Sequence, residues 1–113
     1  VMMSPDSTPL NLLPKDKNMP IMHAYLHPHM GVALTADQMP STAPARTLQL
    51  WFLPKKGQPM GIAIFRPDSS GQVELIAPVK MPRNEIASLV VTEEPGGGSP
   101  QPTTPAAWMA QVN

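Results

Sequence analysis

Residues 47–65 read TLQLWFLPKKGQPMGIAIF, and this stretch decides the fold class. Leucine or phenylalanine stands at 48, 50 and 52, so on an extended chain these side chains share one face. The same two-residue period returns in 60–65, with methionine or isoleucine at 60, 62 and 64. Between the two runs, KKGQ at 55–58 offers a charged tip and a glycine for a tight connection. The stretch therefore predicts a β-hairpin.

Short apolar runs separated by turn residues continue on both sides of this hairpin. The segment PDSSG at 67–71 predicts a turn, because proline fixes φ, Asp or Ser caps backbone amides and glycine accepts a positive φ. At most a short helical turn is expected, around Asn84–Ile86. This spacing is typical of all-β chains, and we predict a small antiparallel β-sandwich of about seven strands. The expected strands are Ile21–His27, Val32–Ala36, Thr47–Leu53, Met60–Phe65, Gln72–Ile76, Ala87–Thr92 and Ala106–Val112.

The composition narrows the class of function. A chain of 113 residues predicts one domain, and its eight basic residues are balanced by eight acidic ones. A net charge of zero argues against binding nucleic acid or an anionic membrane by bulk electrostatics. The absence of cysteine excludes disulfides, zinc–thiolate sites and thiol nucleophiles. The sequence shows neither a signal peptide nor an apolar run near the ~18 residues that span a bilayer, so we expect any anchor to lie outside it.

The first twenty residues differ from the rest of the chain. Prolines at 5, 9, 14 and 20 disfavour helix and remove backbone donors. We predict that residues 1–20 form an extended, proline-rich tether, with its leucines free to pack on the edge of the domain. The β-sandwich domain is expected to occupy residues 21–113. Its edge strands invite pairing with a second copy, so a homodimer is one expected assembly.

The segment 19–30 holds all three histidines and three of the nine methionines. Thioether and imidazole ligands together suit copper, so a periplasmic copper-binding β-sandwich is the alternative function. On a strand, His23 and His27 share a face but stand about 13 Å apart, too far to share an ion. The simpler interpretation is a solvated strand face formed by His23, Tyr25 and His27, with no resident metal or cofactor. The candidate copper ligands are Met19, Met22, His23, His27, His29 and Met30.

The glycine run EPGGGSP at 94–100 does not predict a phosphate-binding loop. Such a loop needs a following helix and usually a lysine, whereas prolines follow here and no lysine comes after Lys80. Ser99 does not fit a nucleophile elbow, because Pro100 and Gln101 replace the small residue and the helix that would expose it. We interpret the run as a tight connection, with glycines at positive φ and the Glu94 carboxylate accepting their amides.

Other candidate chemistry is equally sparse. Glu93 and Glu94 point to opposite faces of a strand, so they do not form an acid/base pair. Trp51 and Trp108 are expected to pack in the core, although an exposed tryptophan would fit a ligand-binding or adhesion module. No set of residues assembles a nucleophile, a base and an oxyanion hole. We therefore expect a protein that is not an enzyme.

Residues 91–103, VTEEPGGGSPQPT, resemble the Val-Thr-x-Glu-Pro-x-Gly-Gly-Ser-x-x-Pro-Thr signature of the anti-sigma-K factor C-terminal domain. Residues 48–51 resemble that family's Tyr-Gln-Leu-Trp strand, and the resemblance covers about residues 32–105. The sequence departs from the family pattern at Leu48, Ala63 and Thr104, where the family has tyrosine, glycine and glycine. The matching residues, expected to be structural, are Gln49, Trp51, Phe65, Thr92, Glu94, Pro95, Gly97, Gly98, Ser99, Pro102 and Thr103.

The resemblance implies a modular, single-pass membrane protein. Its cytoplasmic N-terminal domain would bind an extracytoplasmic-function sigma factor, and a transmembrane helix would precede the tether. The present chain would be the extracytoplasmic sensory domain, and proteolysis outside the cytoplasm would release the sigma factor. Since proteases bind extended, unpaired backbone, residues 4–20 are expected to contain the accessible segment.

Overall fold

The computed structural model describes residues 7–27, 31–78 and 82–112, the side chain of Arg83 excepted. The described chain forms eight β-strands and one short 3-10 helix. In chain order these are β1 (Thr8–Pro14), β2 (Met22–His27), β3 (Gly31–Ala36), β4 (Arg46–Pro54), β5 (Met60–Phe65), β6 (Val73–Ala77), η1 (Arg83–Glu85), β7 (Ile86–Pro95) and β8 (Trp108–Gln111). All seven predicted strands are present, and η1 occupies the position of the expected helical turn.

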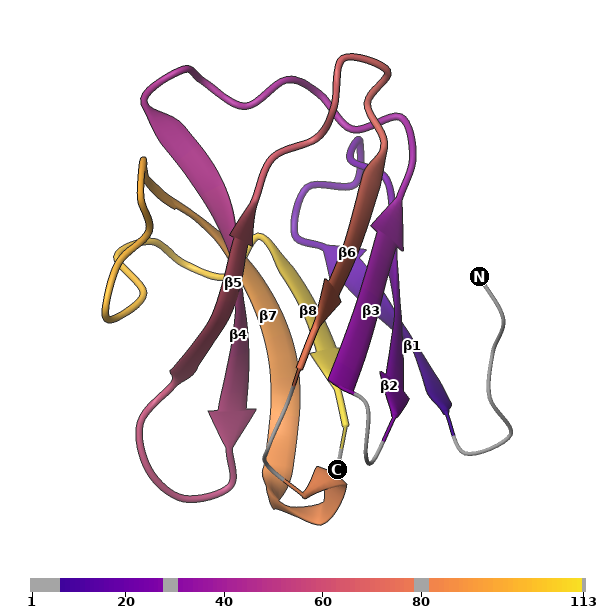
Figure 1. The fold of residues 1–113 in the computed structure, drawn as a ribbon, viewed down its shortest axis with the longest axis vertical. Coiled ribbons are helices and arrows are strands. Elements are labelled where there is room, and N and C mark those ends of the chain that lie inside the picture. Colours follow the sequence, from indigo (N-terminus) through magenta and orange to yellow (C-terminus); the bar gives the residue numbers. More distant parts are fainter. Residues whose placement is uncertain (1–6, 28–30, 79–81, 113) are drawn as a thin grey trace.

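The eight strands form one antiparallel sheet in the order β5-β4-β7-β8-β1-β2-β3-β6 (Figure 1). The sheet curls until its two outer strands, β5 and β6, face each other, which gives a nearly closed, barrel-like form. The all-β prediction is confirmed, but the predicted two-layered sandwich is wrong. The physical reason is the ladder between β1 and β8, where Leu13 pairs with Met109 and Pro14 with Trp108. This ladder joins the two four-stranded halves into one surface.

Residues 8–14 are therefore part of the sheet, and the predicted tether is wrong for this segment. β1 pairs with β2 at residues 8–12 and with β8 at residues 13–14, so each of its residues has a partner in one of the two ladders. Leu12 is fully buried and Leu10 is half-buried, while Pro9 and Leu13 point outward. Leucines at alternate positions were the available signal. The prolines at 9 and 14 obscured it, because proline is rare inside strands.

The core fills the interior of the curled sheet. Every second residue of β4 points inward, and Leu48, Leu50 and Phe52 are all buried there. The alternate face of β4 is buried as well, because the chain after β7 passes over it. The inward-facing core also contains Leu12, Met22, Ala24, Leu26, Val32, Leu34, Val73, Ile86, Leu89, Val91 and Trp108.

Two predicted turns join the strands next to the open seam of the sheet. Residues 55–59 connect β4 to β5 as an exposed hairpin. In the turn from β5 to β6, the Asp68 carboxylate accepts hydrogen bonds from the Ser70 and Gln72 amides, each at 2.9 Å. Gly71 has φ +80°, as the turn requires. The Arg66 guanidinium, which precedes this turn, donates to the backbone carbonyls of residues 42, 43 and 46.

Candidate functional site

Four of the family-signature residues lie on the outer face of β4 and β7, beneath residues 96–107, here called the 96–107 connection. β4 contributes Gln49 and Trp51 to this face, and β7 contributes Thr92 and Glu94, because they alternate with the core-facing residues. Gln49 stands opposite Thr92 in the ladder. The connection leaves the end of β7, crosses this face and returns to the sheet at Ala107, whose amide bonds the Val91 carbonyl at 2.8 Å.

Gln49 fastens the first part of the connection. Its Nε2 donates to the Ser99 carbonyl at 3.2 Å, and its Oε1 accepts from the Ser99 amide at 2.9 Å. A side-chain amide that bonds both main-chain groups of one residue imitates the pairing of a neighbouring strand. Ser99 is thus held through its backbone, which leaves the serine in a structural role.

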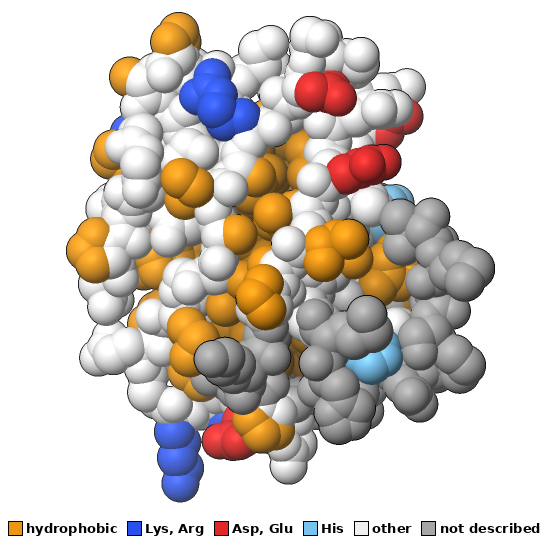
Figure 2. All heavy atoms as spheres, in the orientation of Figure 1, with side chains coloured by type: hydrophobic (Ala, Val, Ile, Leu, Met, Phe, Trp, Pro, Cys, Tyr) orange, Lys and Arg blue, Asp and Glu red, His pale blue; other side chains and the backbone are white. Residues whose placement is uncertain are grey.

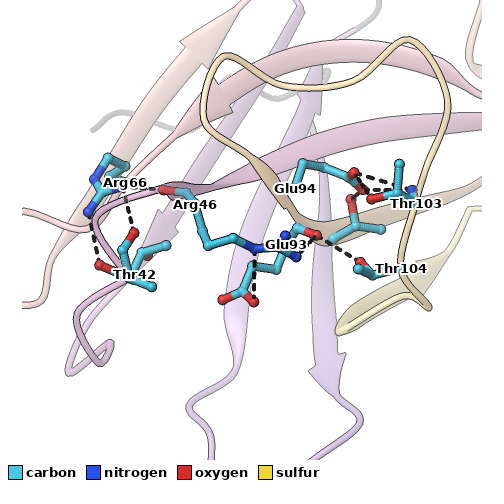
Figure 3. Close-up of polar contacts among 9 residues, drawn as sticks. Thr42, Arg46, Arg66, Glu93, Glu94, Thr103 and Thr104 are labelled. Carbon is cyan, nitrogen blue, oxygen red and sulfur yellow. Dashed lines mark hydrogen bonds and ion pairs between the residues drawn. The ribbon is translucent and has the colours of Figure 1, made fainter.

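A second set of bonds, here called the Glu94 network, fastens the later part. Trp51 Nε1 donates to Thr92 Oγ1 at 2.8 Å, and Thr92 Oγ1 donates to Glu94 Oε2 at 2.5 Å. The carboxylate also accepts the Thr103 hydroxyl at 2.5 Å and the Thr103 amide at 3.2 Å. Figure 3 shows Glu94 and Thr103 pointing toward each other beneath the connection. The expectation that Glu94 accepts glycine amides is wrong, since Thr103 takes that place.

Glu94 is a fully buried carboxylate in a neutral hydrogen-bonded setting. Burial by itself raises the pKa of the Glu94 carboxyl, but the bonds from Thr103, Thr92 and Ser99 act in the opposite direction and prevail. The net pKa lies below its usual value of 4.5. The carboxylate is therefore charged at neutral pH. It serves as an anchor with satisfied acceptors and has none of the properties of a poised general acid.

Two glycines permit the connection to lie this close to β4 and β5. Gly97 and Gly98 have φ +92° and +83°, which confirms the predicted positive φ. A Cβ on Gly98 would stand 2.8 Å from Ile64 Cγ2 and 3.1 Å from Gln49 Oε1, whereas one on Gly97 would meet nothing within 4 Å. Gly98 is thus required for space as well as for conformation.

The remaining signature residues support the same arrangement. Pro95 ends β7, and its carbonyl accepts the Gly98 amide at 2.9 Å in the turn that begins the connection. Pro102 is half-buried directly before Thr103. Phe65 packs against the core from the end of β5, and its carbonyl accepts the Thr47 hydroxyl at 3.0 Å.

Sequence patterns did not single out the polar residues that brace the start of β4. Arg46 lies 3.6 Å from the Glu93 carboxylate in a partly exposed ion pair, and Thr104 Oγ1 donates to the Glu93 carbonyl at 2.9 Å (Figure 3). Arg66 binds the carbonyls of the turn that precedes β4, including that of Thr42 at 2.9 Å. No local motif marks these contacts, because their partners lie 11 to 47 residues apart. Glu93 and Glu94 do point to opposite faces, as predicted.

The structure separates the candidate copper ligands. Met22 is fully buried in the core, whereas His23 lies on the opposite face of β2, exposed and 2.9 Å from Asn11 Oδ1. His27 lies on the outer face with His23, and Met19 packs against the core. Met30 and the third histidine, His29, lie outside the described residues. Within the described part of the chain, no three His, Asp or Glu side chains gather closely enough to hold a metal ion.

Both tryptophans are buried, which confirms their predicted packing role. Trp51 lies under the connection, and Trp108 fills the core, where its Nε1 donates to the Pro20 carbonyl at 2.8 Å. The lining of an open groove of about 530 Å³ includes Trp108, Lys15, Asp16 and Glu93. Neither indole is available for an adhesion surface.

Comparison with known families accounts for this arrangement. The family model described as "Anti-sigma-K factor rskA, C-terminal" matches residues 14–107. The chain belongs to this family. Searches among curated proteins and among solved structures gave no match. The match includes the whole signature and both strands that carry the Glu94 network. Among the described residues, no helix is both long and apolar enough to cross a membrane.

Proposed function

We propose that this chain is the extracytoplasmic sensory and regulatory domain of a membrane-anchored anti-sigma factor. The family match over residues 14–107 carries the proposal. The full-length protein would bind an extracytoplasmic-function sigma factor through a cytoplasmic domain N-terminal to this chain. A transmembrane helix between the two would hold the present domain on the outer side of the membrane, where it regulates release of the sigma factor.

The structure supports a regulatory role over a catalytic one. The polar residues of the family signature hold the 96–107 connection in place. Their hydrogen-bond donors and acceptors are paired with one another or with the backbone of the connection. Among the described residues, every buried side-chain nitrogen or oxygen has a hydrogen-bond partner. Catalytic groups usually retain an unsatisfied or poised atom that meets a substrate, so this site fits an architectural function.

Regulated proteolysis is the proposed means by which release of the sigma factor is controlled. The pairing of β1 in the sheet limits where a protease can cleave. An enzyme that binds extended substrate needs unpaired backbone, whereas every residue of β1 has a ladder partner, Thr8–Leu12 in β2 and Leu13 and Pro14 in β8. The exposed described segment nearest to it is Lys15–Asn18, between β1 and β2. We propose that cleavage in residues 8–14 requires release of β1 from the sheet. The two-position ladder to β8 is its shorter attachment.

The test uses the full-length gene product with tags at both ends. Co-purification of a sigma factor with the N-terminal tag is expected, together with a C-terminal tag that protease reaches from outside intact cells. A full-length product without an upstream transmembrane helix would overturn the proposal. Limited proteolysis of the isolated chain adds a second measurement: cleavage inside β4 or β7 before any cleavage in residues 1–20 would contradict the proposed route.

A further inference from the structure

The two outer strands of the sheet are unpaired along one side. Within the described residues, the backbone of β5 pairs only with β4, and that of β6 only with β3. The turn at residues 66–72 joins these strands, yet they approach each other at few points and form no ladder. The gap between them, here called the β5–β6 seam, presents two rows of backbone donors and acceptors that face one another.

Apart from Glu74, the side chains of β5 and β6 along the β5–β6 seam are apolar. Ile62, Phe65 and Leu75 are partly buried against the core from the inner side. On the outer side Ile64 is 47% exposed and Ile76 is 76% exposed. Figure 2 shows hydrophobic side chains gathered along the middle of this face, between β5 and β6. The apolar strip thus runs beside both unpaired backbones.

Natural sheets usually protect such edges with charged residues, prolines or bulges that face outward. β5 reads MGIAIF and contains neither charge nor proline, and its ladder with β4 shifts register once, between Leu50 and Trp51. β6 carries a single charge, Glu74, which is exposed and forms no ion pair with the described residues. An edge of this kind is suited to accept another strand by main-chain hydrogen bonds.

The near closure of the sheet restricts what can enter. A strand that already belongs to a sheet brings a neighbour on its other side, and that neighbour would collide with β6. A single extended segment has no such neighbour, so it can pair with β5 on one side and β6 on the other. We propose that the β5–β6 seam is a strand-acceptor site for one extended segment of a partner protein, about as long as β5 and alternating in apolar residues.

The charged residues at one end of the β5–β6 seam favour one orientation of the bound segment. Asp68 and Glu74 lie at the end of the seam formed by the 66–72 turn, and both are exposed. Arg66 lies at the same end, but its guanidinium is held by backbone carbonyls. Asp68 and Glu74 outnumber it, so this end of the seam has a net negative charge. The bound segment is therefore expected to place a lysine or arginine beside Glu74.

The test uses the 113-residue chain and fluorescein-labelled peptides with the repeat Val-Thr-Val-Thr-Val and a lysine at one end or the other. Fluorescence anisotropy is expected to show saturable binding of the form whose lysine meets Glu74. Methylation of alternate peptide nitrogens removes main-chain donors without changing side chains, and it should weaken binding at least about tenfold. Amide shifts in NMR spectra are expected to cluster on β5 and β6.

Three variants of the chain sharpen the result. Glu74→Lys should weaken the lysine peptide about threefold or more, yet leave a peptide with glutamine in that place unaffected. Ile76→Lys should weaken both peptides, because a lysine on an edge strand opposes strand addition. Met109→Lys, at an exposed site on the interior strand β8, is the control and should change neither.

Several results would overturn the proposal. One is equal binding of the methylated peptide, and another is NMR shifts confined to the groove beside Trp108. Absence of binding by either peptide up to about 1 mM would also overturn it, since a strand that fills both edges should bind more tightly. Self-association through the seam, detected by light scattering and abolished by Ile76→Lys, would identify a second copy as the occupant and refute the single-segment proposal.

Discussion

Replacing Thr92 by valine tests whether the Glu94 network stabilises the fold. The change keeps a β-branched side chain of similar shape but removes a buried hydroxyl that joins two partners. Trp51 Nε1, 2.8 Å away, loses its acceptor, and an unsatisfied buried donor costs about 1–3 kcal/mol. Glu94 Oε2 loses its 2.5 Å donor but keeps the Thr103 amide at 3.2 Å. The loss of the Thr92 bond to Glu94 therefore adds about 1 kcal/mol to the destabilisation.

Burial of the new methyl group stabilises the folded state by about 0.8 kcal/mol. The expected net loss is therefore about 1–3 kcal/mol in the free energy of unfolding, or about 4–12 °C in Tm for a domain of this size. Urea unfolding at pH 7, followed by circular dichroism, measures it directly. The matched control is Thr35→Val on β3, a half-buried threonine with no side-chain hydrogen bond to the described residues, expected to change stability by less than about 0.5 kcal/mol. Equal losses in the two variants would refute the reasoning.

Three further predictions concern the same face and the separated ligands. Gly98→Ala should destabilise the fold by about 1–2 kcal/mol more than Gly97→Ala, since both have positive φ but only Gly98 lacks space for a Cβ. Equal losses on urea unfolding would contradict this. Because the folded pKa of Glu94 lies below 4.5, its stabilisation is full above that pH and is lost as pH falls through the lower folded value. The stability difference between the unmodified chain and Glu94→Gln should therefore shrink at acidic pH, and a constant difference from pH 7 to 3 would contradict the assignment. Met22→Leu should leave the Cu(II) affinity of the chain unchanged, since Met22 lies in the core opposite His23; weaker binding in a calorimetric titration would refute that placement.

The proposed strand-acceptor site and the proposed regulatory role are compatible but independent. An extracytoplasmic domain that accepts a peptide strand could couple partner binding to the stability of its sheet, because an added strand would bond both free edges. Binding would then raise the free energy needed to release β1. A comparison of limited proteolysis with and without the valine–threonine peptide measures this coupling directly.

Local sequence was enough to determine the strands whose apolar period is uninterrupted. The alternation at 48–52 and 60–64, with a charged, glycine-containing connection between them, predicted the hairpin of β4 and β5. The signature at 91–103 likewise identified the family, because its fixed types stand at fixed spacings within one short segment.

Tertiary structure alone decided what those segments do together. Thr8–Pro14 has a weak local pattern interrupted by prolines, and only pairing with β2 and β8 makes it a strand that turns two possible layers into one curled sheet. The bonds that hold the 96–107 connection join residues 9 to 50 positions apart, so no local propensity encodes them. Burial under that connection also decided the state of Glu94, whose charge is set by the donors around it rather than by its own sequence neighbours.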